Sequence, residues 1–185
     1  MVLLESIAIP LGTKMPEFEL KDPHGKKYKG SDQFAERGLL IVFTCNHCPY
    51  ALAVWPRVIR LAHYAKNLKI NTLAINPNIH PKYPDDAPEK MILKIKELGI
   101  TFPYLVDESQ AVARSFKAQC TPDIYLFNQN RELVYHGRID DNWQDESKVT
   151  KEELKEALNN LAVGQPINPT QRPSMGCSIK WRDNV

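Results

Sequence analysis

Residues 43–50 read FTCNHCPY, and within them Cys45 and Cys48 stand three positions apart. The apolar run LLIVFT at 39–44 predicts a strand that is buried on both faces. Apolar residues at helical spacing from about 49 to 67 predict a helix directly after it. The two cysteines therefore lie at the junction between a buried strand and a helix. Their role depends on the other motifs of the chain.

Two thiols at the start of a helix are suited to thiol–disulfide exchange. Backbone N–H groups and the positive end of the helix dipole favour a thiolate there, and a C-x-x-C pair near a β-α-β pattern is a redox signature. We expect Cys45 to occupy this position, to be the more exposed sulfur and to act as the nucleophile, with Cys48 as the resolving cysteine. His47 lies between them and, when protonated, would stabilise the thiolate of Cys45 further.

Two other interpretations of the pair stay open. Both cysteines would be small core residues if they were simply buried, as free cysteine often is. A metal site is the other interpretation, and zinc would need four ligands, drawn from the pair, a histidine and either Cys120 or Cys177. Cu(I) would need His136 to reach the pair. The chain has no second C-x-x-C, so the sequence favours the redox pair over the metal site.

The composition excludes several classes of protein. The chain has 185 residues, of which 43% are hydrophobic and 25% charged, with a net charge of +2, an ordinary globular balance. Its Lys and Arg residues are scattered among acidic ones, so no basic stripe predicts a nucleic-acid partner, and no apolar run approaches the ~20 residues of a membrane span. The start, MVLLESIAIPLGTK, does not read as a signal peptide. We therefore expect a cytoplasmic protein whose cysteines are reactive rather than structural.

Strands and helices alternate along the chain. We expect a hairpin within 15–29, a short helix at 31–37, strands at 39–44, 70–76 and 102–106, helices at 49–67, 89–98 and 109–117, and an antiparallel hairpin from 123–127 and 132–137. A last helix would open with a capping box at Thr150 and stop at Gly164. This order predicts an α/β fold, a three-layer sandwich around a mixed sheet. One domain would take residues 1–164, with 165–185 as a tail packed on it.

A second motif, Cys120-Thr121-Pro122, directly precedes the strand expected at 123–127. In a redox fold of this order, a cis-proline here would pack against the C-x-x-C loop and leave backbone groups free to pair with a substrate peptide. We therefore expect Thr121 and Pro122 to bind substrate, with Tyr50 beside them at the rim of the site.

Together these motifs resemble the peroxiredoxin-like proteins of the thioredoxin fold, in the alkyl hydroperoxide reductase/thiol-specific antioxidant group. The segments that carry the resemblance cover nearly the whole chain: MPEFEL (15–20), CNHCPY (45–50), YPDDAPEKM (83–91), FPYLVDESQAVARSF (102–116), CTPDIYLF (120–127) and PSMGCSIKW (173–181). The resemblance implies a thioredoxin-like α/β/α sandwich with an N-terminal β-hairpin and a helix–strand insertion. It also implies a thiol–disulfide oxidoreductase without a cofactor, in which Cys45 attacks, Cys48 resolves and Pro122 is the cis-proline. Peroxide reduction, an antioxidant activity, is the alternative.

Two departures from the family pattern bear on the chemistry. A peroxiredoxin has a threonine three residues before its reactive cysteine, and here that residue is Val42. Thioredoxin has a buried aspartate six residues before its first cysteine, and here that residue is Leu39. The first departure argues against efficient peroxide reduction. The second leaves the proton acceptor for the resolving thiol open among His47, Asp123 and Glu108.

Two further thiols and the partners complete the prediction. Cys120 would be either a third redox thiol or a small core residue, and Cys177 in the tail would either fold back as a further resolving thiol or simply pack. Asp85 and Asp86 fit the first turn of a helix, where the dipole favours acidic residues. The chemistry implies a protein disulfide or dithiol as substrate, and an electron donor such as a thioredoxin-like protein or glutathione.

Overall fold

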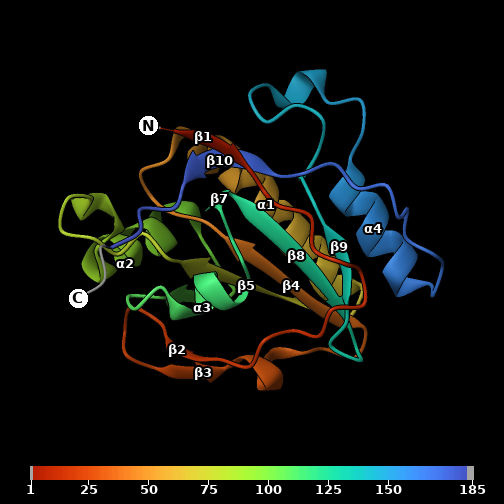
Figure 1. Cartoon of the computed structure of the whole chain (residues 1–185), viewed down its shortest axis with the longest axis horizontal. Coiled ribbons are helices and arrows are strands. Elements are labelled where there is room, and N and C mark those ends of the chain that lie inside the picture. The colour runs from red at the N-terminus through yellow and green to blue at the C-terminus, as the bar shows by residue number, and fades with distance from the viewer. Residues whose placement is uncertain (1, 183–185) are drawn as a thin grey trace.

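The computed structural model describes residues 2–182, and its centre is a seven-stranded mixed sheet (Figure 1). Across the sheet the strands are β3 (Lys27–Lys29), β2 (Glu19–Lys21), β6 (Tyr104–Val106), β5 (Ile70–Asn76), β4 (Gly38–Phe43), β8 (Asp123–Asn128) and β9 (Leu133–His136). The middle strands β4, β5 and β6 run parallel, and β2 and β8 pair with them antiparallel. Every residue of β4 is buried, as the apolar run predicts.

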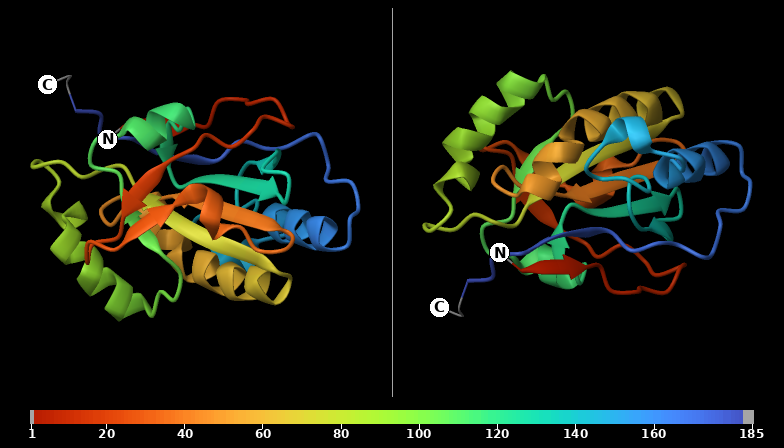
Figure 2. Two further views of the ribbon diagram at one scale, coloured as in Figure 1. Left: turned by 90° about the horizontal axis from the view of Figure 1, so that it is seen from below. Right: turned by 90° about the horizontal axis from the view of Figure 1, so that it is seen from above.

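Helices cover the two faces of this sheet unequally (Figure 2). One face carries α1 (Pro49–Asn67), α2 (Pro88–Leu98) and α4 (Glu153–Ala162), and the other carries the short α3 (Ala111–Ser115) with extended N-terminal and C-terminal segments. The predicted three-layer sandwich is confirmed, although its second outer layer holds a single short helix. Among residues 2–182, the structure contains no helix with the length and apolar character that crossing a bilayer requires.

A small second sheet joins the two ends of the chain. Its order is β1 (Leu3–Glu5), β10 (Met175–Ser178) and β7 (Cys120–Thr121), all antiparallel. Strands this short give no alternation in the sequence, so β1 and β10 were not predicted. Part of the predicted tail thus lies beside the proline motif, whereas residues 183–185 of that tail and residue 1 of the predicted domain lie outside the described residues.

Two local predictions are wrong. The helix expected at 31–37 is a 3-10 turn, η1 (Gly30–Gln33), after which the chain extends toward β4. The capping box expected at Thr150 does not form, because the hydroxyl of Thr150 donates to the Asp141 carboxylate of a neighbouring loop. The helix begins instead at Glu153, since a nearby acceptor competes for the capping side chain.

Candidate active site

The C-x-x-C motif joins the end of β4 to the start of α1, and Cys48 rather than Cys45 stands at the helix start. Cys48 is the N-cap residue of α1, with an extended backbone, and its carbonyl oxygen accepts the Leu52 N–H at 2.9 Å. Pro49 makes the helix begin after Cys48, because the proline ring fits the first helical position and disfavours a helical conformation in the residue before it. The expectation that Cys45 would occupy the helix start is therefore wrong.

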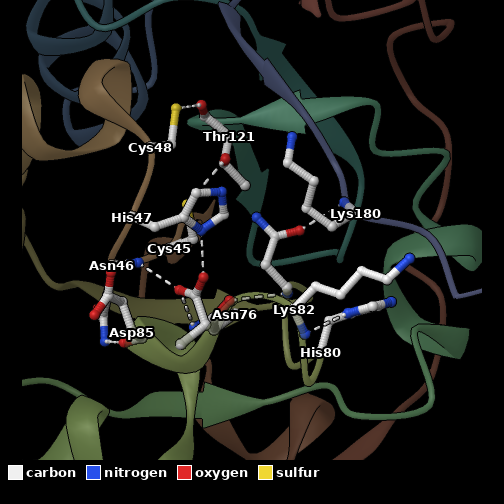
Figure 3. Close-up of polar contacts among 12 residues, drawn as sticks. Cys45, Asn46, His47, Cys48, Asn76, His80, Lys82, Asp85, Thr121 and Lys180 are labelled. Atoms are coloured by element: carbon white, nitrogen blue, oxygen red, sulfur yellow. Dashed lines mark hydrogen bonds and ion pairs between the residues drawn. The ribbon is translucent and has the colours of Figure 1, made fainter. Parts of the chain in front are cut away.

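The sulfur of Cys48 is surrounded by hydrogen-bond donors. The thiol of Cys45 contributes most, followed by the thiol of Cys177, the N–H of Ala51 and the N–H of Cys177; together they lower the pKa of Cys48 to about 5, although burial opposes them. The carbonyl oxygen of Thr121 lies 3.2 Å from the same sulfur (Figure 3) and would accept from its thiol form. The four donors favour the thiolate of Cys48, whereas this single acceptor favours its thiol form.

The surroundings of Cys45 favour its thiol form. Burial raises its pKa well above the ordinary value, and the hydrogen bond with Cys48 and the negative charge of Asp86 raise it further. Its sulfur lies 3.2 Å from the hydroxyl oxygen of Thr121, a hydrogen bond that partly offsets the rise. The indole N–H of Trp55 donates to the Cys45 carbonyl oxygen at 3.3 Å and fixes the loop.

Neither sulfur of the pair is open to solvent. Cys45 and Cys48 are both 0% exposed, so the expectation that Cys45 would be the more exposed is wrong. Strand β10 brings Cys177, which is 1% exposed, into one buried cluster with both cysteines and Ala51. Strand β10 is therefore one of the elements that bury the pair.

His47 lies beside Cys45 and is bound to a buried carboxylate, that of Asp86 (Figure 3). Nδ1 of His47 and Oδ2 of Asp86 form a short hydrogen bond, and the imidazole stacks on the ring of Tyr83 with centroids 4.7 Å apart. Nε2 of His47 is buried and has no hydrogen-bond partner among residues 2–182. Ligand atoms of Cys45, His47 and Asp86 all lie within 4.8 Å of one another. The His47–Asp86 pair thus lies beside Cys45 without a hydrogen bond to its sulfur among the described residues.

Asp86 is the residue of the site that the sequence prediction missed. We expected Asp85 and Asp86 in the first turn of a helix, but Asp86 ends the 3-10 turn η2 (Pro84–Asp86) and is fully buried. It accepts the backbone N–H of Asn46 at 2.6 Å and the side-chain amide of Asn76 at 3.0 Å. The prolines on either side of this Asp pair signal a turn, but nothing local shows which carboxylate is buried.

The other predicted proton acceptors are engaged elsewhere. Asp123 is buried with Oδ1 2.9 Å from Nε2 of His136, and its other oxygen accepts the Tyr125 hydroxyl at 3.0 Å. Glu108 lies at the surface, where its carboxylate is 3.5 Å from Arg182. His136 therefore pairs with Asp123 rather than with the cysteines, so it does not reach the pair as the alternative Cu(I) site would need.

The proline motif lies against the cysteine pair, as expected. The Thr121–Pro122 peptide bond is cis, and Thr121 contacts both sulfurs of the pair. Tyr50 packs on the sulfur cluster. The expectation that the backbone at Thr121 would be free is wrong, because Cys177 of β10 is paired with it. A cavity of about 340 Å³ lies beside Pro122 and β10 without reaching either sulfur of the pair.

The two additional thiols are placed differently. Cys177 is hydrogen-bonded to Cys48 within the sulfur cluster, and burial raises its pKa to about 12. Cys120 lies on β7, where its thiol donates to the Pro122 carbonyl oxygen at 3.5 Å and burial raises its pKa. Cys177 thus belongs to the site, whereas Cys120 lies in the core beside it.

Comparison with known proteins agrees with this geometry. A model of the AhpC/TSA family matches residues 11–136, a range that contains both the C-x-x-C and the proline motif. The thiol-disulfide oxidoreductase ResA of Geobacillus kaustophilus is 25% identical over 130 residues, which is 70% of this chain and 70% of that protein.

Solved structures extend the likeness to the whole chain. A conserved protein of Geobacillus kaustophilus, described as uncharacterized, matches with a TM-score of 0.95 and 39% identity over 100% of this chain and 99% of that one. The thioredoxin domain of a thiol-disulfide oxidoreductase from Bacteroides vulgatus matches with a TM-score of 0.57 and 16% identity over 70% and 89% of the two chains. The second likeness shows the fold alone.

Proposed function

The chain belongs to the AhpC/TSA family, and from this premise we propose how it works as a thiol–disulfide oxidoreductase of the thioredoxin fold. Cys48 is the attacking sulfur, and Cys45 is the resolving one. The observation that carries this assignment is the N-cap position of Cys48, where the helix start and the surrounding donors favour a thiolate. The assignment keeps the same pair and reverses the order that the helix-start argument and the resemblance both predict.

The first step is attack on a substrate disulfide. The thiolate of Cys48 forms a bond to one substrate sulfur, the substrate S–S bond breaks, and the second substrate sulfur leaves as a thiolate that takes a proton from solvent. A thiolate with a pKa near 5 is fully formed at neutral pH, so no base is needed for this step. The product is a mixed disulfide between Cys48 and the substrate.

The second step resolves the mixed disulfide and does need a base. Cys45 is a buried thiol with a raised pKa, and ligand atoms of His47 and Asp86 lie within 4.8 Å of its sulfur, which makes this pair the candidate base. Deprotonated Cys45 attacks the Cys48 sulfur, the bond from Cys48 to the substrate breaks, and the substrate leaves as its second thiol. The protein is left with a Cys45–Cys48 disulfide, and an external dithiol or two molecules of a monothiol return it to the reduced form.

The partners follow from this chemistry. We propose a protein disulfide or dithiol as substrate, docked beside cis-Pro122, where the neighbouring cavity offers room for side chains. A thioredoxin-like protein or glutathione would supply the electrons. The proposed location is the cytoplasm, because such donors are held reduced there.

Metal binding is the second candidate, and one observation favours it. The ligand atoms of Cys45, His47 and Asp86 lie close enough together to share an ion, and sulfur, imidazole and carboxylate ligands suit zinc better than Cu(I). Nδ1 of His47 is already bonded to Asp86, however, so an ion would have to replace that bond. Metal binding therefore stands second.

Insulin reduction tests the proposal. With dithiothreitol as electron source, the wild type is expected to accelerate reduction and Cys48→Ser to abolish the acceleration. Cys120→Ser is the matched control, because Cys120 is a buried thiol outside the cluster, and this variant should still accelerate insulin reduction. Unchanged turnover in Cys48→Ser would refute the assignment. Peroxide consumption without insulin reduction would favour the peroxidase, and tight stoichiometric zinc without turnover would favour the metal site.

A further inference from the structure

Strand β10 lies where a substrate peptide was expected. It runs antiparallel to β7 directly beside the cis-proline, with Cys177 opposite Thr121 and Ser178 opposite Cys120. Figure 1 shows this C-terminal segment between β1 and β7, and it contacts α1. Extended peptides are commonly held by adding a strand to a sheet edge in this way. The chain's own C-terminal segment therefore occupies the peptide position.

The fit of β10 against the cis-proline depends on Gly176. A Cβ atom at this position would lie 2.1 Å from the Thr121 carbonyl oxygen, 2.6 Å from its carbon and 3.0 Å from the Pro122 nitrogen. These are backbone atoms and cannot turn aside, so a side chain here would push the strand away. Glycine thus allows the strand to approach the Thr121–Pro122 peptide closely enough to bring the next residue, Cys177, to the pair.

Cys177 presents its sulfur to Cys48. Its thiol and its backbone N–H both donate to the Cys48 sulfur, and the N–H of Tyr50 is directed at the sulfur of Cys177. The charge of Lys180 also favours a Cys177 thiolate, against the burial that opposes it. Cys177 and Cys45 therefore contact the same attacking sulfur from two different parts of the chain.

We propose that Cys177 is a second resolving cysteine, which forms a disulfide with Cys48 and is carried into the site by a strand in the position of a substrate peptide. This inference rests on the proposed function. From the mixed disulfide, the Cys177 sulfur attacks Cys48, the Cys48–Cys177 bond forms, and the bond from Cys48 to the substrate breaks. The departing substrate thiolate takes the Cys177 proton. Two protein thiols are oxidised and one substrate disulfide is reduced to two thiols, so the electrons balance.

The same contact links the two resolving cysteines. Attack of Cys45 on the Cys48–Cys177 disulfide forms the Cys45–Cys48 disulfide and releases Cys177 as a thiol, without an external oxidant or reductant. When Cys177 is the cysteine bonded to Cys48, the covalent Cys48–Cys177 bond holds β10 down over the site. The disulfide to Cys45 leaves β10 held by non-covalent contacts alone, so the next partner can displace it.

Oxidised glutathione is a suitable probe, because the two steps release two separate molecules of glutathione. The variants are Cys45→Ser, Cys45→Ser/Cys177→Ser and the control Cys45→Ser/Cys120→Ser, each checked for folding by circular dichroism and thermal unfolding. Cys45→Ser and the control are expected to release two glutathiones per chain and to yield a Cys48–Cys177 disulfide in peptide mapping. Cys45→Ser/Cys177→Ser should release one and stop as a glutathione adduct of Cys48.

The outcomes separate the inference from the proposed function. A glutathione adduct on Cys48 that persists in Cys45→Ser would overturn the role of Cys177 while leaving Cys48 as the attacking sulfur. The absence of any adduct on Cys48 in all three variants would overturn both. The double variant Cys45→Ser/Gly176→Ala gives a second test and keeps Cys48, Cys120 and Cys177. In it, the second glutathione is expected to be released at least tenfold more slowly than the first. Equal release rates would contradict the placement of β10.

Discussion

Removal of the Cys45 thiol is the sharpest test of the electrostatics of the site. The hydrogen bond from Cys45 is the largest single cause of the low pKa of Cys48. Cys45→Ala deletes this donor, whereas Cys45→Ser keeps a hydroxyl at the same place. The two variants therefore differ in one hydrogen bond to the thiolate, and we expect the pKa of Cys48 to rise in the alanine variant much more than in the serine variant.

The size of the effect follows from the strength of such a bond. A hydrogen bond to a charged group contributes about 1.5–3 kcal/mol, and one pKa unit corresponds to about 1.4 kcal/mol. Loss of the donor should therefore raise the pKa of Cys48 by about one to two units, from about 5 in the wild type. The donors on Ala51 and Cys177 remain in both variants, so the value should stay below that of an ordinary cysteine.

The ultraviolet absorbance of the thiolate, followed as the reduced protein is titrated, gives this pKa without requiring a reagent to enter the buried site. Because burial raises the pKa of Cys120 and Cys177, the lowest step in each variant belongs to Cys48, and a Cys48→Ser variant should lack it. Equal midpoints in the alanine and serine variants would refute the assigned hydrogen bond. A wild-type midpoint near the ordinary cysteine value would refute the thiolate itself.

Three further predictions concern the base, the covering strand and the fold. Asp86→Asn should slow resolution of the mixed disulfide about a hundredfold while leaving its formation intact; quenched-flow mass spectrometry would show the intermediate accumulating, and a slow first step instead would assign Asp86 another role. Gly176→Ala, in the otherwise wild-type protein, should speed alkylation of Cys48 by iodoacetamide, because the new Cβ collides with the backbone of Thr121 and pushes β10 away from Cys48. An unchanged alkylation rate would contradict the placement of β10 over Cys48. Arg57→Leu should cost about 3–5 kcal/mol of unfolding free energy, since it leaves the buried Asp140 carboxylate without its partner at 2.6 Å; a loss below about 1 kcal/mol in urea unfolding would contradict this.

The sequence predicts the cysteine pair, but the prediction of which cysteine attacks and which resolves differs from the order that the structure favours. The sequence places a C-x-x-C pair at the junction of β4 and α1, and the structure confirms that junction. Pro49 also carried the information that the helix begins after Cys48, because the residue before a proline avoids helical conformation. The expected roles of Cys45 and Cys48 came from placing Cys45 at the helix start, and the resemblance implied the same order. The N-cap position of Cys48 now favours the opposite order.

Local patterns in the sequence predict the strand–helix order, the sandwich, the cysteine pair between β4 and α1 and the proline before β8, because periodicity and turn chemistry act over a few residues. The folded chain alone reveals that Asp86 is buried against His47, 39 positions away, and that the C-terminal strand places Cys177 on Cys48. These contacts join segments that no local pattern links, and short strands such as β10 exist only because a partner strand accepts their hydrogen bonds. Which thiol loses its proton first is likewise a property of the assembled site, since pKa values depend on burial and on donors from distant parts of the chain.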